Sequence, residues 1–111
     1  MNKTVNKTNF KKEVLDSKEL VLVQFKKEWN GASQIIAPVY SDLAESYKAM
    51  VRFFTVDIEK EQGLDSEYGV MEIPTILFFK NGEIIDHVVG LTPKNMLIAK
   101  IEAAISQQFN Q

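Results

Sequence analysis

The stretch that most constrains the fold is "LVLVQFK", residues 20–26, which is a nearly continuous apolar run. A strand with one solvated face alternates apolar and polar residues, whereas a strand covered on both faces is apolar throughout. A second run, "VRFFTVD" at 51–57, is rich in β-branched and aromatic residues and is typical of another central strand. The two runs together predict a sheet that helices cover on both faces.

The segment between these strands has the period of a helix. It is predicted to begin near Asn30 to Ser33 and to end at about Met50, with a kink at Pro38, where one backbone hydrogen bond is lost. Its apolar residues at spacings of three and four are Ile36, Val39, Leu43 and Tyr47.

Two shorter helices are predicted on weaker patterns. Thr8 or Asn9 can cap a helix that runs to about Ser17, with its apolar face made by Phe10, Val14 and Leu15. A second helix is expected around 60–68, although Gly63 interrupts it.

The C-terminal third contains a hairpin signal and one more helix. Asn81-Gly82 lies between "TILFFK" and "EIIDHVV", and both turn positions favour residues that tolerate positive φ. Thr92-Pro93 then predicts an N-cap and a first-turn proline. The helix that follows should turn Leu97, Ile98, Ile101 and Ile105 inward. Strands that alternate with helices and end in a hairpin indicate an α/β fold with a mixed central sheet, in one domain over residues 1–111.

Charge and hydropathy exclude several partners. The net charge is −2, so no basic surface argues for nucleic acid or for an anionic membrane. No stretch approaches the ~18 apolar residues of a membrane span. The N-terminal "MNKTVNKTNFKKEV" has no apolar segment of the kind found in secretory signals. We therefore expect a cytoplasmic protein without nucleic-acid or membrane partners.

The chain has no cysteine and one histidine. Disulfides, thiolate nucleophiles, cysteine metal sites and iron–sulfur clusters are therefore excluded. His87 has Glu83 and Asp86 nearby in sequence, but a metal site needs several convergent ligands, so a solvated hairpin face is the simpler interpretation. No glycine-rich phosphate loop is present. We expect neither a metal nor another cofactor.

Four segments, spanning roughly Phe10 to Ile105, resemble the thioredoxin family. "VLVQF" followed by "EWNGASQIIAPV" resembles the strand, active-site turn and proline-containing helix of that family. "VDIEKEQGLDSEYGVMEIPT" is similar to its third strand, short helix and cis-proline loop, and "ILFFKNGEIIDHVVGL" to its closing hairpin and glycine loop. The resemblance implies a thioredoxin fold.

The resemblance fails at the residues that carry the family's chemistry. The active-site motif aligns with Trp29, Asn30, Gly31, Ala32 and Ser33. Asn30 takes the place of the nucleophilic cysteine, Ser33 that of the resolving cysteine, and Ala32 that of the central proline. The family's buried acid aligns with Gln24, and the lysine that pairs with it aligns with Thr55.

These replacements exclude thiol–disulfide exchange, which needs a thiolate to attack and a second thiol to release the product. Ser33 could act as a nucleophile only with a general base in reach, and His87 is predicted on the hairpin, away from the turn. Asn30 and Ser33 are better explained as capping residues whose side-chain oxygens accept helix N–H groups. For Gln24, we expect a buried amide that its neighbours satisfy.

The surface around the former active site can still bind. Ile73-Pro74-Thr75 resembles the cis-proline loop, which in the family offers backbone groups to an extended peptide, although the loop can also serve the fold alone. Trp29 is either an interface anchor or a side chain that shields the helix start. Met71 and Glu72 would edge the groove, and Glu28 and Glu72 would make it acidic. The expected apolar rim consists of Gly31, Ala32, Ile73, Pro74, Gly90 and Leu91.

Three functions remain open at this point. The favoured hypothesis is a redox-inactive thioredoxin-like module that binds a protein or extended peptide through Trp29, Ile73, Pro74 and Gly90. The alternative is a family member of cell redox homeostasis that works with thiols supplied by a partner. A structural relic without a dedicated partner is the third.

Overall fold

The computed structural model describes residues 3–109 and contains a five-stranded sheet in the order β1-β3-β2-β4-β5. β1, β3 and β2 are parallel, whereas β4 runs antiparallel to both β2 and β5. The predicted mixed sheet is therefore confirmed. The strands are β1 (Lys3–Thr4), β2 (Leu20–Lys26), β3 (Val51–Asp57), β4 (Thr75–Lys80) and β5 (Glu83–Val89).

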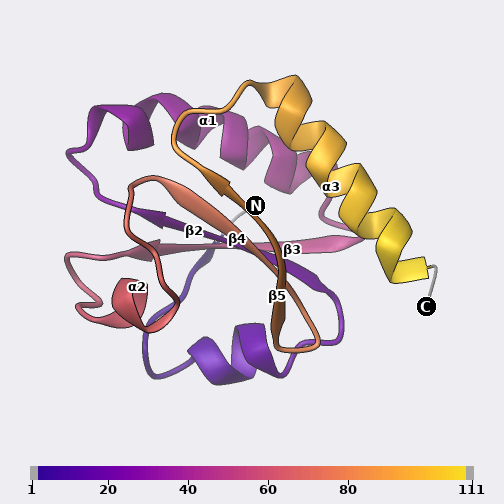
Figure 1. The fold of residues 1–111 in the computed structure, drawn as a ribbon, viewed down its shortest axis with the longest axis horizontal. Coiled ribbons are helices and arrows are strands. Elements are labelled where there is room, and N and C mark those ends of the chain that lie inside the picture. The colour runs from indigo at the N-terminus through magenta and orange to yellow at the C-terminus, as the bar shows by residue number, and fades with distance from the viewer. Residues whose placement is uncertain (1–2, 110–111) are drawn as a thin grey trace.

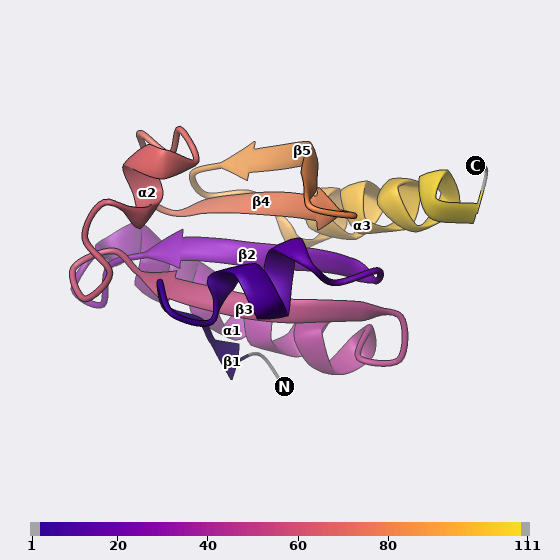
Figure 2. The same cartoon turned by 90° about the horizontal axis from the view of Figure 1, so that it is seen from below.

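Helices cover both faces of this sheet, as the apolar strands predicted. Figure 1 shows α1 and α3 on one face, and α2 with the π-helix η1 on the other; Figure 2 shows the second face from below. Successive β2 residues alternate between two cores, with Leu22 in the core under α1 and α3 and Val23 in the core under η1 and α2. The helices are η1 (Lys11–Leu15), α1 (Gly31–Ser46), α2 (Leu64–Glu67) and α3 (Lys94–Phe109).

The predicted helix ends need correction at three places. The N-terminal helix is the five-residue η1 rather than a helix from Thr8 or Asn9 to Ser17. α1 ends at Ser46, not at about Met50, because the N–H groups of Met50 and Val51 both bond to the Tyr47 carbonyl in a turn that leads directly into β3. The helix expected around 60–68 covers only four residues, because Gly63 precedes it in a left-handed conformation with φ of 92°.

Two further features differ from the prediction. β1 was missed, since a two-residue edge strand is too short to show periodicity. Thr92 does not cap α3, because its hydroxyl instead donates to the Gly90 carbonyl at 3.3 Å. Among residues 3–109, no helix is both long and apolar enough to cross a membrane.

Tyr40 is a buried part of the core that periodicity did not predict. Its ring is 1% exposed and lies edge-on to Phe53, with ring centroids 5.3 Å apart. Its hydroxyl donates to the Phe54 carbonyl at 2.6 Å and lies 3.0 Å from the Leu22 carbonyl. Burial raises the pKa of Tyr40 well above its ordinary value. The hydroxyl thus ties α1 to the two central parallel strands without leaving an unpaired polar group in the core.

Tyr47 links the end of α1 to α3. Its hydroxyl donates to the Glu102 carboxylate at 2.6 Å, and this hydrogen bond raises the pKa of Tyr47 to about 12. A raised folded-state pKa contributes stability that is complete below the unfolded value and is lost as pH rises through the folded value. The contact should therefore stabilise the fold fully below a pH of about 10 and lose its contribution by a pH of about 12.

Tyr47→Phe should remove the tyrosinate absorbance step near a pH of about 12 and flatten the fall in unfolding free energy between about 10 and 12. Glu102→Gln is the matched control, since it keeps an acceptor but removes the charge and should lower the pKa of Tyr47. A Tyr47 that ionises at its ordinary pKa in the folded protein would contradict the contact.

Candidate functional site

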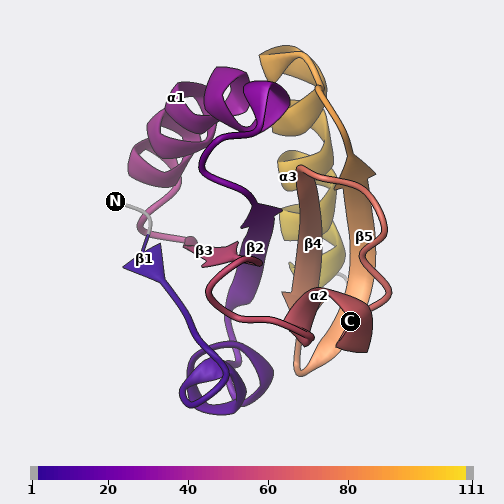
Figure 3. The same ribbon diagram turned by 90° about the vertical axis from the view of Figure 1, so that its left-hand side faces the viewer.

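The ends of three strands meet at one end of the sheet, where the former active-site motif lies. Phe25 near the end of β2 pairs with Thr75 at the start of β4, and Thr75 pairs with Val89 at the end of β5. The Gly90 N–H donates to the Pro74 carbonyl at 2.7 Å, which joins the two following loops. Figure 3 shows these strand ends near the first turn of α1. The fold therefore gathers the motif, the proline loop and Gly90 in one place.

Asn30 is the N-cap of α1, as predicted. Its backbone is extended, with φ of −85° and ψ of 126°, and its side chain accepts the Ser33 N–H at 2.8 Å. The Gln34 N–H donates to the Asn30 carbonyl at 3.0 Å, so the first helical turn is closed. A helix start of this kind favours negative charge, because its N–H groups point outward. The helix N-terminus that would stabilise a thiolate at position 30 is thus present.

Ser33 has a different place from the one predicted. It is 3% exposed, and its hydroxyl accepts the Lys27 N–H at 3.5 Å rather than a helix N–H. The prediction that Ser33 caps the helix is therefore wrong. Ser33 lies beneath the turn, where this hydrogen bond connects the first turn of α1 to the segment that follows β2.

His87 cannot serve Ser33 as a general base. It pairs across the strands with Leu77, and directly opposed residues project from the same face of a sheet. Leu77 belongs to the core under η1 and α2, whereas α1 lies on the opposite face. The sheet therefore separates the imidazole from Ser33. Among residues 3–109, no group of three or more His, Asp or Glu side chains could hold a metal ion.

Gln24 and Thr55 are neighbours under the turn, and one of them has an unsatisfied polar group. The two residues are directly paired between β2 and β3, and they are 1% and 8% exposed. The Gln24 amide nitrogen has no hydrogen-bond partner among the described residues. The prediction that neighbours satisfy this amide is therefore wrong. Leu22 and Ile76 on this face are apolar, and the amide nitrogen does not donate to the Thr55 hydroxyl beside it.

A hydrogen bond between residues on either side of Ile73–Pro74 stabilises the proline loop. The Ile73–Pro74 peptide bond is cis, and the Thr75 hydroxyl donates to the Glu72 carbonyl at 2.6 Å. Pro74 is buried and Ile73 is half-buried against the core under η1 and α2. Pro74 is thus not part of an exposed rim as predicted, although the loop lies beside Gly90.

The exposed apolar surface has other members than those predicted. Trp29 is 83% exposed, so it does not shield the helix start. Leu91 is 55% exposed, and Ile35, which sequence reasoning missed, is 64% exposed. Ile35 lies outside the row of Ile36, Val39, Leu43 and Tyr47, whose spacings of three and four mark the core face, and this is the signal that would have found it. These two exposed side chains line an apolar groove of about 350 Å³ with Ile36, Val39, Thr92 and Pro93.

Charge beside Trp29 is mixed rather than acidic. Lys26, Lys27 and Glu28 line a hollow of about 280 Å³ next to the indole, so two cations offset the predicted acid. The Gln34 side chain donates to the Glu28 carbonyl at 3.0 Å and closes one wall. The acidic character expected for the site is therefore absent on this side of Trp29.

Comparison with known proteins gives one consistent result. The thioredoxin family model matches residues 1–103. A thioredoxin of Rickettsia felis is 39% identical over 105 residues, which are 95% of this chain and 100% of the relative. A thioredoxin of Chlorobaculum thiosulfatiphilum is 36% identical over 97 residues, 87% of this chain and 90% of the relative. A chloroplastic M-type thioredoxin of Spinacia oleracea is 36% identical over 92% of this chain and 56% of the relative. The chain belongs to the thioredoxin family.

Proposed function

We propose that this chain is a redox-inactive protein-binding module that uses the surface around its vacated active site. We call this the Trp29 surface and define it by its exposed and half-buried residues, which are Trp29, Asn30–Ala32, Ile73, Gly90 and Leu91. Its partner would be a protein or an extended peptide. A cytoplasmic location and the absence of nucleic-acid and membrane partners stay predictions from the sequence.

One observation carries this proposal: the site keeps its architecture while its sequence holds no sulfur nucleophile. The cap at Asn30, the Gly90–Pro74 hydrogen bond and an indole that is 83% exposed are all present. A lone tryptophan held in solvent exposes a large apolar area, and such side chains are frequent anchors of interfaces. Binding needs this surface alone, whereas disulfide exchange would need cysteines that the chain does not have.

A second function has one observation in its favour. The relatives named above are thioredoxins, and the α1 start would still stabilise a negative sulfur brought to it by another protein. A chain working with partner-supplied thiols would then bind in a way that depends on the redox state of the partner. Dependence of capture on reductant therefore separates the two functions.

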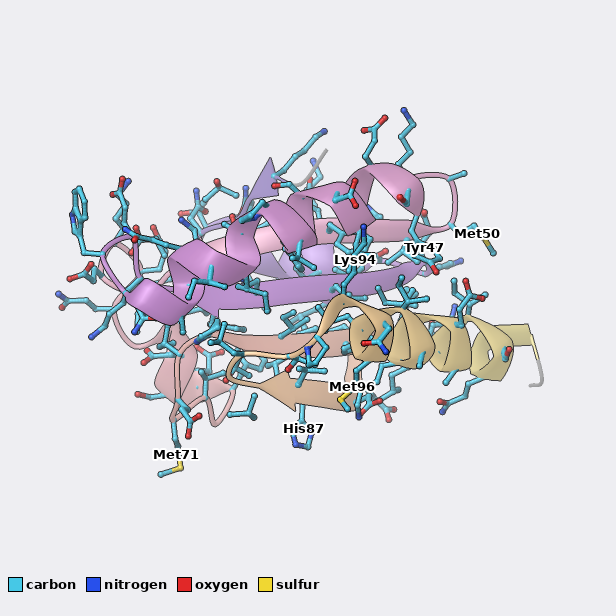
Figure 4. All side chains as sticks on the ribbon, turned by 90° about the horizontal axis from the view of Figure 1, so that it is seen from above. Tyr47, Met50, Met71, His87, Lys94 and Met96 are labelled. Atoms are coloured by element: carbon cyan, nitrogen blue, oxygen red, sulfur yellow. The ribbon has the colours of Figure 1, made fainter. Side chains whose placement is uncertain are left out.

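Trp29→Ala is expected to reduce capture of a specific partner from the native host about tenfold or more, as truncation of an interface anchor does. Leu91→Ser should act in the same direction. Both side chains are exposed, so circular dichroism should show an unchanged fold. Met50→Ser is the matched control, because Met50 is also an exposed apolar residue, with 42% of its surface in solvent. It lies at the other end of the molecule from Met71, which is two residues before Ile73 of the Trp29 surface (Figure 4). Capture that survives both Trp29→Ala and Leu91→Ser would reject this surface.

A further inference from the structure

A second apolar groove lies on the other face of the sheet, over β4 and β5. It has a volume of about 400 Å³. Its floor includes Leu77, with Ile84 and Val89 of β5 beside it, and the segment Tyr68–Glu72 forms its wall. We call it the β4–β5 groove. Figure 4 shows Met71 and His87, which also line it, projecting from the same side of the molecule.

The groove exists because the helices on this face are short. η1 and α2 have five and four residues, and their buried side chains pack over β2, β3 and β4. β5 adds only Val88 to a buried core, and that is the core under α1 and α3. Ile84 and Val89 therefore stay 45% and 47% exposed, and Met71 on the wall is 97% exposed. Apolar side chains grouped in this way are typical of a contact surface.

The charge at the groove is negative and unneutralised. Glu72 lines it, and the carboxylate makes no hydrogen bond or ion pair with any residue in the described part of the chain. Its Oε2 lies against Gly90, 3.4 Å from the point a β-carbon there would occupy. Among residues 3–109, no lysine or arginine lines the groove. Lys80 lies opposite Glu83 in the strand register, at the far end of the hairpin from Glu72. Its amine donates a hydrogen bond to the Lys18 carbonyl.

The backbone hydrogen bonds of β5 limit the places where a peptide can pair with the edge of the sheet. Gly90 donates its N–H toward β4, so alternation along an antiparallel strand directs the N–H and C=O of Val89 to the open edge of β5. The next edge N–H, that of His87, is taken by the Asp86 carboxylate at 2.8 Å. Asp86 thus protects the middle of the edge from pairing, and main-chain pairing is left to the end beside Glu72.

We propose that the β4–β5 groove receives an extended peptide segment of a partner, in which an apolar residue and a lysine or arginine stand two positions apart, so that both side chains project from the same face of the peptide. An apolar side chain enters between Leu77, Ile84 and Val89, the basic side chain meets Glu72, and the peptide backbone pairs with Val89. This inference rests on the proposed function, because the groove adjoins the Trp29 surface at Gly90 and would give its partner a stated chemistry.

The probe is a capped hexapeptide with leucine at its first two positions and lysine and arginine at the third and fourth, so that each face of the extended peptide carries a leucine and a basic residue two positions apart. Its acidic counterpart carries glutamate at both basic positions. Titration of each peptide into the labelled full chain, followed by backbone amide NMR, should move the signals of Met71, Glu72, Ile84 and Val89. The basic peptide should bind about fivefold more tightly than the acidic one at low salt, and this preference should shrink as salt is added.

Single substitutions test the charged contact and the apolar contact of the groove separately. Glu72→Gln should remove most of the preference for the basic peptide, whereas Ile84→Ser should weaken both peptides. Both side chains are exposed, so the fold should persist. Met50→Ser should change neither affinity. Three results would each contradict peptide binding in the groove. They are equal binding of the two peptides, an absence of binding, and signal changes confined to Trp29, Asn30 and Leu91.

The same titration separates this inference from the proposed function. If the basic peptide shifts the groove signals equally in the Trp29→Ala variant while host capture never depends on Trp29, the groove stands and the proposed function fails. If capture depends on Trp29 but the peptides show no charge preference, the proposed function stands and the inference fails.

Discussion

Disulfide reduction is expected to appear when Asn30→Cys, Ala32→Pro and Ser33→Cys are introduced together, whereas the unaltered chain should stay at the uncatalysed background. The unaltered chain has no thiol that can attack a disulfide. The variant places two thiols at the N-cap and third helical positions of α1. The measurement is insulin reduction driven by an excess of small dithiol.

The structure explains why the introduced thiols should work. The Ser33 N–H now donates to the Asn30 side chain at 2.8 Å, and the same N–H would face a thiolate at position 30. This contact and the helix start both favour the charged sulfur, which is the nucleophile. The thiolate attacks a substrate disulfide and forms a mixed disulfide. The second thiol then attacks that bond, which releases the reduced substrate and leaves an intramolecular disulfide for the dithiol to reduce.

The restored activity should nevertheless stay below that of an ordinary thioredoxin. The buried groups beneath the turn are the neutral Gln24 and Thr55, and neither can exchange a proton near neutral pH. General acid–base assistance is worth roughly a hundredfold or more, so a deficit of at least about tenfold is expected. Adding Gln24→Asp to the triple variant should recover part of this deficit.

A matched control keeps the result interpretable. Ser33→Cys alone leaves no attacking thiol at position 30 and should give no turnover above background. If the triple variant is folded by circular dichroism yet inactive, the site geometry described here is not that of a working thioredoxin. Turnover by the unaltered chain would show that the protein is not redox-inactive.

Gln24→Leu is expected to raise the free energy of unfolding by about 1–2 kcal/mol, which is unusual for a core substitution. The Gln24 amide nitrogen is buried without a partner, and an unpaired buried polar group costs roughly 1–3 kcal/mol. Leucine has a similar size and leaves no polar atom to desolvate. Urea unfolding of the two proteins measures the difference.

Gln24→Glu is the control of opposite sign. Burial should raise the pKa of the introduced carboxyl above its unfolded value, so the variant should lose stability as pH rises above about 4. At lower pH, where the carboxyl is neutral in both states, its stability should approach that of the unaltered chain. Destabilisation by Gln24→Leu at all pH values would show that the amide has a partner, such as a buried water.

The strands were the part of the fold most open to prediction. Residues 20–26 and 51–57 were bounded correctly because apolar runs of this length fit a covered sheet and little else. Helix ends were less predictable, since the end of α1 depends on the Tyr47 carbonyl accepting two N–H groups in a turn. β1 depends on pairing with β3 rather than on its own two residues.

The site was predictable in sequence but not in exposure. The cap at Asn30 follows from local chemistry, and the structure confirms it. The burial of Pro74, the missing partner of Gln24 and the 83% exposure of Trp29 depend on how separate segments pack, which one sequence does not specify. The β4–β5 groove was missed for the same reason, because it results from helices too short to reach β5.

The most direct test is the dissociation constant of a captured partner, measured with the purified chain in the presence and absence of excess dithiol. We expect one value in both conditions, and a value about tenfold or more weaker for Trp29→Ala. Binding that requires the oxidised partner, or that Trp29→Ala leaves unchanged, would contradict a thiol-independent contact at the Trp29 surface.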